Sequence, residues 1–238
     1  PAEMERRARA LGAQTGFPFE AALRGKDIAF ICEVKKASPS KGVIALEFPY
    51  RQIALDYEAA GAAAVSVLTE PAYFQGADAY LSDIAAAVGI PVLRKDFTVD
   101  SYMIYEARTL GAAAVLLIAA LLDGDTLRDY IGVAHSLGLS ALVEAHTAEE
   151  TEVAVKAGAR IIGVNNRDLR TFQVDTGNCL RLRPLVPRSV LFVAESGVRT
   201  AADIDRLRAG GVDAVLVGET LMRAPDRKAA LAALRGTP

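Results

Sequence analysis

The sequence contains no tryptophan and only two cysteines and two histidines among its 238 residues. Cys32 and Cys179 lie far apart, so they form none of the local cysteine spacings of zinc or redox sites. Two isolated cysteines are typical of a protein in the reducing cytoplasm, where we expect this one to lie. The histidines, His135 and His146, are too few for a histidine-rich metal site, so we expect no bound metal.

Long apolar runs are also absent. The longest, 112–122, is much shorter than the roughly 20 residues that a membrane-spanning helix needs. The N-terminus is charged and lacks the apolar segment of a secretory signal. The 27 basic and 29 acidic residues leave a net charge of −2, which gives no support for nucleic-acid binding. From its composition we therefore expect neither a membrane nor a nucleic-acid partner, while a local anion site stays open.

What the sequence does contain is a series of short, continuous apolar segments rich in β-branched residues. They do not alternate with polar residues, which is typical of parallel strands buried on both faces. The predicted strands cover residues 29–34, 64–69, 92–95, 114–118, 141–145, 161–165, 190–194 and 214–217. Predicted helices cover 50–60, 77–88, 101–110, 125–137, 148–157, 176–182, 200–209 and 225–234.

The ends of several predicted helices repeat one pattern. Gly61-Ala-Ala-Ala-Val65 recurs as Gly111-Ala-Ala-Ala-Val115, with looser copies at 158–162 and 211–215. Glycine stops the helix, and the next strand follows at once. Eight such units predict an α/β protein with a single (β/α)8 TIM barrel. An open doubly wound sheet is the alternative, but the Gly-x-Gly-x-x-Gly turn typical of it is missing.

One catalytic domain is expected over 29–238, preceded by a short helical extension over 1–28. Within the extension, the pattern indicates a helix over 2–11 and a short segment over 19–23. No low-complexity tract or linker divides the chain.

Charged and amide residues stand at the ends of the predicted strands, where a barrel places its active site. Residues two apart in a strand point to the same face, so they share one pocket if they point inward. These residues are Glu33, Lys35, Lys95, Glu144, Asn165, Arg167 and Glu195. Each alone fits a structural ion pair, but the whole set favours one catalytic pocket. Arg94 and Asp96 flank Lys95 and are expected to point away from it, and Cys32 to face the helices.

Glycines follow the last two predicted strands, in Ser196-Gly197 and Gly218-Glu219. At these two loops a TIM barrel often binds phosphate through backbone N–H groups. Either glycine alone fits a tight turn; together they favour a phosphate site. His146, two residues after Glu144, fits either the pocket rim or a structural role, and His135 fits helix packing.

Seven motifs extend these strand ends. They are Glu33-Val-Lys-Lys-Ala-Ser-Pro-Ser-Lys-Gly42, Val67-Leu-Thr-Glu70, Leu93-Arg-Lys-Asp-Phe97, Val143-Glu144, Asn165-Asn-Arg-Asp-Leu169, Ala194-Glu-Ser-Gly197 and Val217-Gly-Glu219. In this order they resemble the indole-3-glycerol-phosphate synthase family, over about residues 19–222. The resemblance implies ring closure, decarboxylation and dehydration of 1-(2-carboxyphenylamino)-1-deoxyribulose 5-phosphate, a step of tryptophan biosynthesis. It implies no cofactor, because the iminium formed on ring closure accepts the electrons of decarboxylation.

The same resemblance implies a role for each site residue. Lys95 is the acid of ring closure, Glu144 the general base, and Lys35 the carboxylate ligand and a later acid. Glu33 binds substrate hydroxyls and orients the lysines. The residues that position the substrate are Asn165, Arg167 and Glu195, with Phe97 and Pro39 against its aromatic ring. The implied phosphate site comprises Ser38, Ser196, Gly197, Gly218 and Glu219, the last mainly through its backbone N–H.

Two departures from the family pattern affect these expectations. Glu219 stands where many members carry serine, so its carboxylate is expected to point away from a phosphate. The N-terminal extension is short, whereas members usually carry a longer helical segment that covers the barrel mouth, so a first helix is expected to be missing. We expect no isomerase domain of the kind that is fused to some members. A monomer is expected, since no large apolar stripe demands a dimer.

Three alternatives remain at this point: a phosphosugar isomerase, a Schiff-base aldolase that uses Lys95, and a non-catalytic phosphate binder on the same barrel. Glu33, Lys35 and Glu144 are all present, which favours the synthase.

Overall fold

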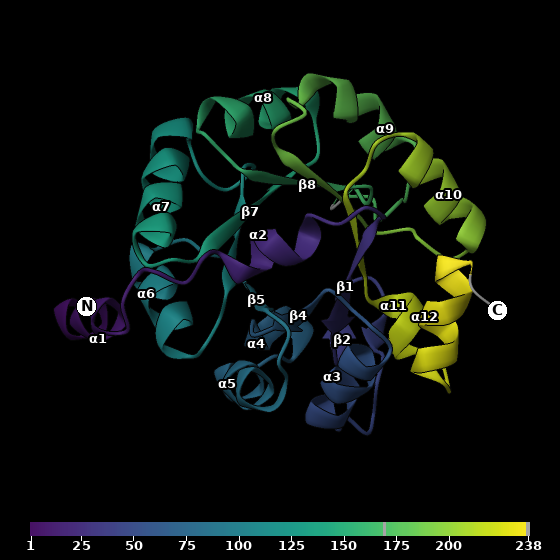
Figure 1. Cartoon of the computed structure of the whole chain (residues 1–238), viewed down its shortest axis with the longest axis horizontal. Helices are drawn as coiled ribbons and strands as arrows, with labels where there is room; N and C mark the ends of the chain where they lie inside the picture. Colours follow the sequence, from purple (N-terminus) through teal and green to yellow (C-terminus); the bar gives the residue numbers. More distant parts are fainter. Residues whose placement is uncertain (169, 237–238) are drawn as a thin grey trace.

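The computed structural model describes residues 1–168 and 170–236, and its main sheet is a closed barrel of parallel strands (Figure 1). Leu169 of the predicted 165–169 motif and residues 237–238 of the predicted domain lie outside the described residues. The strands are β1 (Ala29–Val34), β4 (Ala64–Leu68), β5 (Val92–Lys95), β6 (Ala114–Ile118), β7 (Ser140–Ala145), β8 (Ile161–Asn165), β9 (Leu191–Glu195) and β10 (Ala214–Val217). Each lies beside the next in the chain, and β1 closes the ring by pairing with β10.

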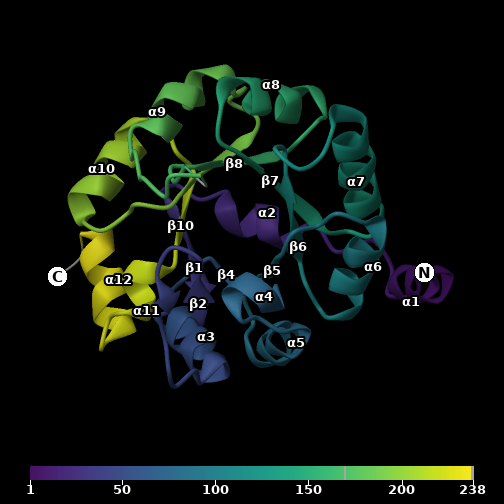
Figure 2. The ribbon, with the colours of Figure 1, turned by 180° about the vertical axis from the view of Figure 1, so that it is seen from behind.

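The described helices lie around this ring, except for α2, which lies across its middle in both views (Figures 1 and 2). They are α1 (Ala2–Ala10), α2 (Pro18–Leu23), α3 (Tyr50–Ala59), α4 (Pro71–Phe74), α5 (Asp78–Ala87), α6 (Ser101–Thr109), α7 (Gly124–Ser136), α8 (Ala148–Lys156), α9 (Asn178–Leu182), α10 (Ala201–Ala209), α11 (Glu219–Met222) and α12 (Arg227–Arg235). A 3-10 turn, η1 (Arg183–Leu185), follows α9. No helix in the described part of the chain is long and apolar enough to cross a membrane.

The predicted (β/α)8 barrel is confirmed, and every predicted barrel strand has its counterpart within one residue at each end. The glycine repeat acts as expected: Gly61 and Gly111 adopt φ of 81° and 90°, which favours glycine, and each precedes a strand closely. The sequence missed the ribbon of β2 (Ala37–Ser38) and β3 (Gly42–Val43) and the single turns α4 and α11. Elements of two to four residues are too short for hydrophobic periodicity to reveal.

Two hydrophobic clusters hold the barrel together. The outer one lies between strands and helices and contains Cys32 with Tyr57 and Phe192, so Cys32 faces the helices as predicted. The inner one fills the barrel with side chains such as Ile31 and Leu93. Because successive strand residues point to opposite faces, the same strands supply both clusters. The strands are therefore fixed from both sides, which positions the side chains at their carboxyl ends.

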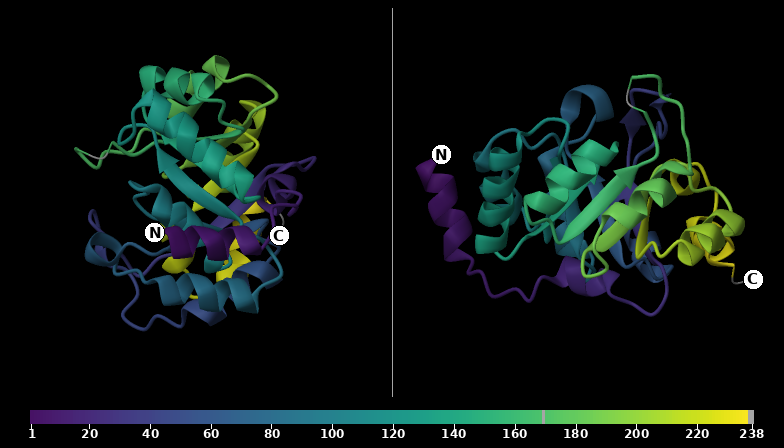
Figure 3. Two further views of the ribbon diagram at one scale, coloured as in Figure 1. Left: turned by 90° about the vertical axis from the view of Figure 1, so that its left-hand side faces the viewer. Right: turned by 90° about the horizontal axis from the view of Figure 1, so that it is seen from above.

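Helix α2 closes the amino end of the barrel. Its Phe19 and Leu23 are fully buried and join the inner cluster. Its Glu20 pairs with Arg160 at 2.7 Å and accepts a hydrogen bond from Ser140 at 3.4 Å, at the start of β7. In the right-hand view of Figure 3, α2 lies at one end of the barrel and the loop after β8 projects from the other. The N-terminal segment of this chain thus covers the mouth opposite to the strand carboxyl ends.

Helix α1 packs outside the ring against α6 (Figure 1). Tyr105 of α6 donates a hydrogen bond to Glu5 at 3.3 Å, and the Arg9 guanidinium lies over the same ring. This helix therefore extends the outer helical layer of the barrel.

Candidate active site

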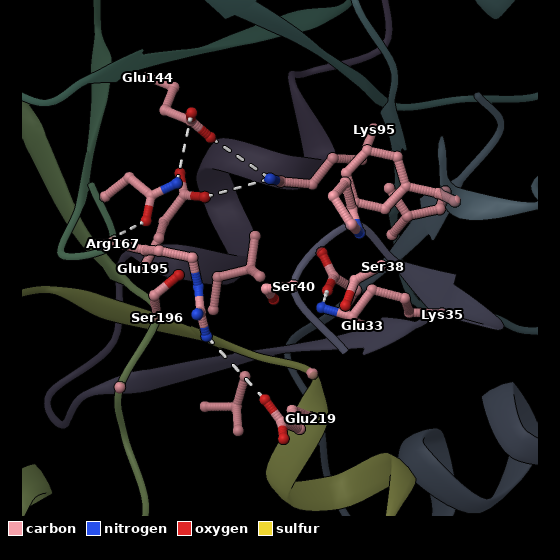
Figure 4. Close-up of a pocket in the computed structure, with 18 of the residues that line it drawn as sticks. Glu33, Lys35, Ser38, Ser40, Lys95, Glu144, Arg167, Glu195, Ser196 and Glu219 are labelled. Atoms are coloured by element: carbon pink, nitrogen blue, oxygen red, sulfur yellow. Dashed lines mark hydrogen bonds and ion pairs between the residues drawn. The ribbon is translucent and has the colours of Figure 1, made fainter. Parts of the chain in front are cut away.

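A cavity of about 650 Å³ opens at the carboxyl ends of the strands. The residues that the sequence predicts for the site all line it: Glu33, Lys35, Ser38, Pro39, Lys95, Phe97, Glu144, Asn165, Arg167, Glu195, Ser196, Gly197, Gly218 and Glu219. Figure 4 shows their charged groups facing one another from opposite sides of the barrel. The structure thus brings into one pocket residues that lie up to 186 positions apart in the chain.

Lys95 lies at the centre of a group of carboxylates. It is the last residue of β5, where Leu93 and Lys95 point inward and Arg94 points outward. Its Nζ lies 3.3 Å from Oε2 of Glu144 and 3.3 Å from Oε2 of Glu195. Burial lowers the pKa of Lys95, but Glu195 and Glu144, which are both ionised in the alkaline range where a lysine titrates, outweigh burial and hold this pKa above its ordinary value. Lys95 is therefore an ammonium group at neutral pH.

Glu144, on β7, is held in the ionised form. Burial raises its pKa, but Lys95 and His146 outweigh that effect and lower the pKa below its ordinary value. Asn165 of β8 donates a hydrogen bond to Oε1 of Glu144 at 3.4 Å. An ionised, oriented carboxylate beside an ammonium group is suited to accept a proton during a reaction.

Glu195, on β9, differs from Glu144 in its protonation. Its side chain is 2% exposed, and its Oε1 has no hydrogen-bond partner among the described residues. Burial raises its pKa to about 8, the negative charge of Glu144 adds to the rise, and Lys95 opposes it. Gly163 on the next strand makes room for this carboxyl group, because a Cβ there would overlap it. At neutral pH Glu195 is therefore mostly a neutral carboxylic acid.

Glu195→Gln is expected to change how the free energy of unfolding depends on pH. The pKa in the folded protein, about 8, lies above the ordinary value of about 4.3, so the stabilising contribution is full below about pH 4 and is lost as pH rises through 8. Glutamine does not titrate, so the variant should gain in Tm relative to the parent between pH 6 and pH 9. Thermal unfolding at several pH values measures this difference. A difference in Tm that stays constant over the range would contradict the raised pKa.

Glu33 and Lys35 form a second ion pair across the pocket. Their Oε1 and Nζ lie 2.6 Å apart, and both come from the end of β1. Burial raises the pKa of Glu33, but Lys35 and Lys95 outweigh it and lower the pKa. Gly218 leaves space for this pair, because a Cβ there would crowd the Glu33 carboxylate.

At the pocket mouth, the Glu219 carboxylate lies near three basic side chains. Its carboxylate lies 3.2 Å from Arg223, 3.7 Å from Lys41 and 3.9 Å from Arg167. Glu219 lies on the pocket wall, and its carboxylate reaches toward Arg167 (Figure 4), so its orientation away from a bound phosphate stays a prediction. The surplus of positive charge at this rim attracts the carboxylate.

The loop after β9 has a strained backbone. Ser196 and Gly197 adopt φ of 67° and 88°, and Ser196 is one of the few residues other than glycine in this region. A Cβ on Gly197 would clash with Val174 and Thr176, so glycine lets the two loops pack closely. Strained backbone of the kind seen at Ser196 often occurs at ligand sites, and the phosphate site at Ser196 and Gly197 stays a prediction.

An aromatic wall was missed by sequence reasoning. Tyr73 and Phe74 of α4 contact the ring of Phe97, with centroids 6.4 and 6.2 Å away, and all three line the cavity. Helix α4 is a single turn whose cap is Glu70, which accepts hydrogen bonds from three backbone N–H groups. The sequence signal for this turn was Glu70-Pro71, an acidic cap followed by proline at the first helical position.

The neighbours of the predicted site have mostly structural roles. Arg94 points away from the pocket as predicted and pairs with Asp78 and Glu106, each at 2.9 Å. Asp96 borders the cavity, but its carboxylate has the structural role that was predicted: it pairs with Arg94 at 3.6 Å and accepts hydrogen bonds from Thr69 and the Phe97 N–H.

The two histidines lie outside the cavity wall. His146 sits behind Glu144, and His135 packs edge-on against the Phe17 ring. Burial and the nearby Arg160 lower the pKa of His135 to about 4. Within residues 1–168 and 170–236, no group of three or more histidine, cysteine, aspartate or glutamate side chains is arranged to hold a metal ion.

Comparison with known proteins adds a family to this geometry. The family model described as "Indole-3-glycerol phosphate synthase" matches residues 2–234. Proteins of that name are 61% identical in Ruminiclostridium cellulolyticum, over 93% of this chain and 85% of that protein, and 50% identical in Leuconostoc mesenteroides, over 98% and 90%.

Solved structures that resemble this one show the fold alone. A 3-hexulose-6-phosphate synthase has a TM-score of 0.68 at 16% identity and covers 88% of this chain and 99% of its own. A thiamine phosphate pyrophosphorylase from Pyrococcus furiosus has a TM-score of 0.65 at 18% identity, with 90% and 96% covered.

Proposed function

This chain belongs to the indole-3-glycerol phosphate synthase family, and from that premise we propose how its pocket performs the family's reaction. The substrate is 1-(2-carboxyphenylamino)-1-deoxyribulose 5-phosphate, and the products are indole-3-glycerol phosphate, carbon dioxide and water. One observation carries the proposal: an ammonium group, Lys95, lies between an ionised and a neutral carboxyl group inside a deep cavity.

Ring closure requires a proton at the substrate ketone. As the aryl carbon that bears the carboxylate attacks the carbonyl carbon, Lys95 donates a proton to the carbonyl oxygen, which becomes a hydroxyl group. The ring nitrogen is then an iminium. Loss of carbon dioxide returns the electrons of its C–C bond to the ring and neutralises that iminium. The raised pKa of Lys95 supports an acid that is fully protonated when the reaction begins.

Dehydration requires the removal of a proton and of the new hydroxyl group. Glu144 takes the proton from carbon, and its lowered pKa supports a base that is ionised at neutral pH. Lys35 first binds the substrate carboxylate and then protonates the leaving hydroxyl group. Glu33, paired with Lys35 at 2.6 Å, orients that lysine and binds substrate hydroxyls.

The remaining residues hold the substrate in place. Asn165, Arg167 and Glu195 position its polar groups, and Phe97 and Pro39 pack against its aromatic ring. The phosphate binds at Ser38, Ser196, Gly197, Gly218 and the backbone of Glu219. Their common position on the wall of one cavity, on the loops after β1, β9 and β10, supports this assignment.

The test is turnover of purified protein with the carboxyphenylamino-deoxyribulose phosphate. Formation of the fluorescent indole product, with release of one carbon dioxide for each product, is the expected result. Tight binding of the substrate without product would contradict the proposal and favour a phosphate-ligand binder. A Schiff-base aldolase needs a neutral amine, and the raised pKa of Lys95 argues against that alternative.

Glu219→Gln is expected to lower KM for the phosphorylated substrate by about two- to fivefold, because an exposed charge interaction is worth up to about 1 kcal/mol. The change removes a negative charge near the phosphate and releases Arg167 and Lys41 to bind it. Steady-state kinetics and inhibition by inorganic phosphate measure the effect, with kcat little altered. Glu152→Gln, on the exposed face of α8, is the control. A higher KM in Glu219→Gln would show instead that the carboxylate assists binding.

We include three further features in the proposal. Residues 1–28 form an extension, and residues 29–238 form the catalytic barrel. The position of α2 supports this division, because this helix of the extension covers only the amino end of the barrel. The enzyme is a monomer, since exposed large apolar residues such as Leu46 and Leu185 lie on separate segments; light scattering tests this state. It works in the cytoplasm, which suits its free, buried cysteines.

A further inference from the structure

His146 lies directly behind Glu144, on the side away from the cavity. It follows β7 and its side chain is 15% exposed. Its Nε2 lies 3.5 Å from Oε1 of Glu144, and its Nδ1 lies 3.3 Å from Oε2 of Glu150 on α8. The imidazole ring therefore connects a carboxylate of the pocket to a carboxylate of the outer helical layer.

The backbone holds the ring in this position. The N–H of His146 donates a hydrogen bond to Oε2 of Glu150 at 2.7 Å, and its carbonyl accepts one from Asn178 at 3.0 Å. Thr147 then caps α8 by accepting a hydrogen bond from the Glu150 N–H. Since Glu150 binds both the backbone and the ring of the same residue, the helix start fixes where the imidazole points.

The charges around the ring determine what it does. Both ring nitrogens face carboxylate oxygens. An ionised carboxylate can accept a hydrogen bond but cannot donate one, so both contacts are attractive when each ring nitrogen carries a proton. The other groups that face Glu144 are Lys95 from β5, Asn165 from β8, and the carboxyl group of Glu195 from β9, with Glu33 farther across the pocket. Lys95 contacts Oε2 and His146 faces Oε1, so the two sides of the Glu144 carboxylate have separate partners.

We propose that His146 is a positioning residue for the general base Glu144, and that Glu150 holds its ring in place. The inference rests on the proposed function, in which Glu144 removes the proton during dehydration. His146 does not line the cavity, so it acts on the reaction through the orientation and charge of Glu144 and not through the substrate.

The test is a double-mutant cycle of His146→Gln and Glu150→Gln. His146→Gln should lower kcat by up to about tenfold, the effect of about one pKa unit on Glu144, because Nε2 makes a 3.5 Å electrostatic contact with Glu144 and no hydrogen bond, while KM changes less than about twofold. Its pH profile should also change: without His146 the pKa of Glu144 rises, so the acidic limb of kcat moves to higher pH. Glu150→Gln should act in the same direction but less strongly. The double variant should equal His146→Gln, because Glu150 acts through the ring.

Glu149→Gln is the matched control, since it removes the same charge from the same first turn of α8 without contacting the ring. It should leave kcat and the pH profile unchanged. The proposal would be overturned if the losses in kcat of the two single variants added in the double variant. It would also be overturned if Tm fell while the acidic limb of the kcat–pH profile stayed in place. If His146→Gln does not fold, Glu150→Gln carries the test, because a shift of its acidic limb is still required.

A second readout separates this inference from the proposed function. The ¹³C resonance of the Glu144 carboxyl group, followed by NMR as a function of pH, reports its titration without turnover. A higher pKa in His146→Gln supports the contact, and an identical titration overturns it. Absence of turnover in the parent enzyme would overturn the proposed function alone.

Discussion

Lys95→Met is expected to reduce kcat by roughly 10²- to 10⁴-fold, the usual contribution of a positioned proton donor. The substitution also leaves the carboxyl groups of Glu144 and Glu195 without their shared cation, so the charge distribution around the substrate is lost. The indole fluorescence assay measures the loss in single-turnover and steady-state experiments. Circular dichroism and substrate binding establish that the variant is folded.

Lys95→Arg distinguishes proton donation from simple charge pairing. Arginine keeps the positive charge but does not release a proton in proteins, so this variant should also lose most of its turnover. Lys156→Met, on the exposed face of α8, should match the parent. Substantial turnover in Lys95→Arg would limit Lys95 to an electrostatic role, and substantial turnover in Lys95→Met would remove it from the mechanism.

The largest loss of stability is expected from Phe19→Ala. Phe19 of α2 is fully buried against the side chains that fill the barrel, and truncation of such a ring costs about 3–5 kcal/mol. For a protein of this size the corresponding fall in Tm is roughly 6–20 °C. Thermal and urea unfolding measure the change.

From the location of Phe19 we also expect that Phe19→Ala leaves catalysis unchanged. Because α2 closes the amino end of the barrel, the pocket at the carboxyl end should keep its kcat and KM at low temperature. Phe17→Ala is the matched control: Phe17 is only half-buried and its ring contacts the Arg160 guanidinium, so its loss should cost about 1 kcal/mol. Equal losses of stability in the two variants would contradict the role of α2 in closing the amino end of the barrel.

The sequence predicted the barrel well because parallel strands and glycine helix ends are local signals. Two examples are the apolar segment that ends at Lys95 and the end of a helix at Gly111. Each depends only on residues within a few positions in the chain. The same locality explains how the pocket residues were found: alternation along a strand places Leu93 and Lys95 on one face whatever the rest of the chain does.

The features that the sequence did not predict lie beyond the strand ends. No periodic rule fixes the direction of the Glu219 side chain, and its carboxylate reaches toward Arg167, which is distant in the chain. The aromatic wall of Tyr73 and Phe74 depends on a helix of one turn. The segment over 19–23 was recognised, but its sequence does not reveal which end of the barrel it covers. These features depend on contacts between elements that are far apart in the chain.

The closure of the ring has a consequence for synthesis of the chain. β1 pairs with β4 on one side and with β10 on the other, through registers such as Ala29 with Ala214. During translation, one edge of β1 therefore keeps its backbone N–H and C=O groups without a strand partner until residue 214 has been added. The pairing of β1 with β10 therefore completes the first and the last strand of the ring together, and only then does Glu33, on β1, face the other walls of the pocket.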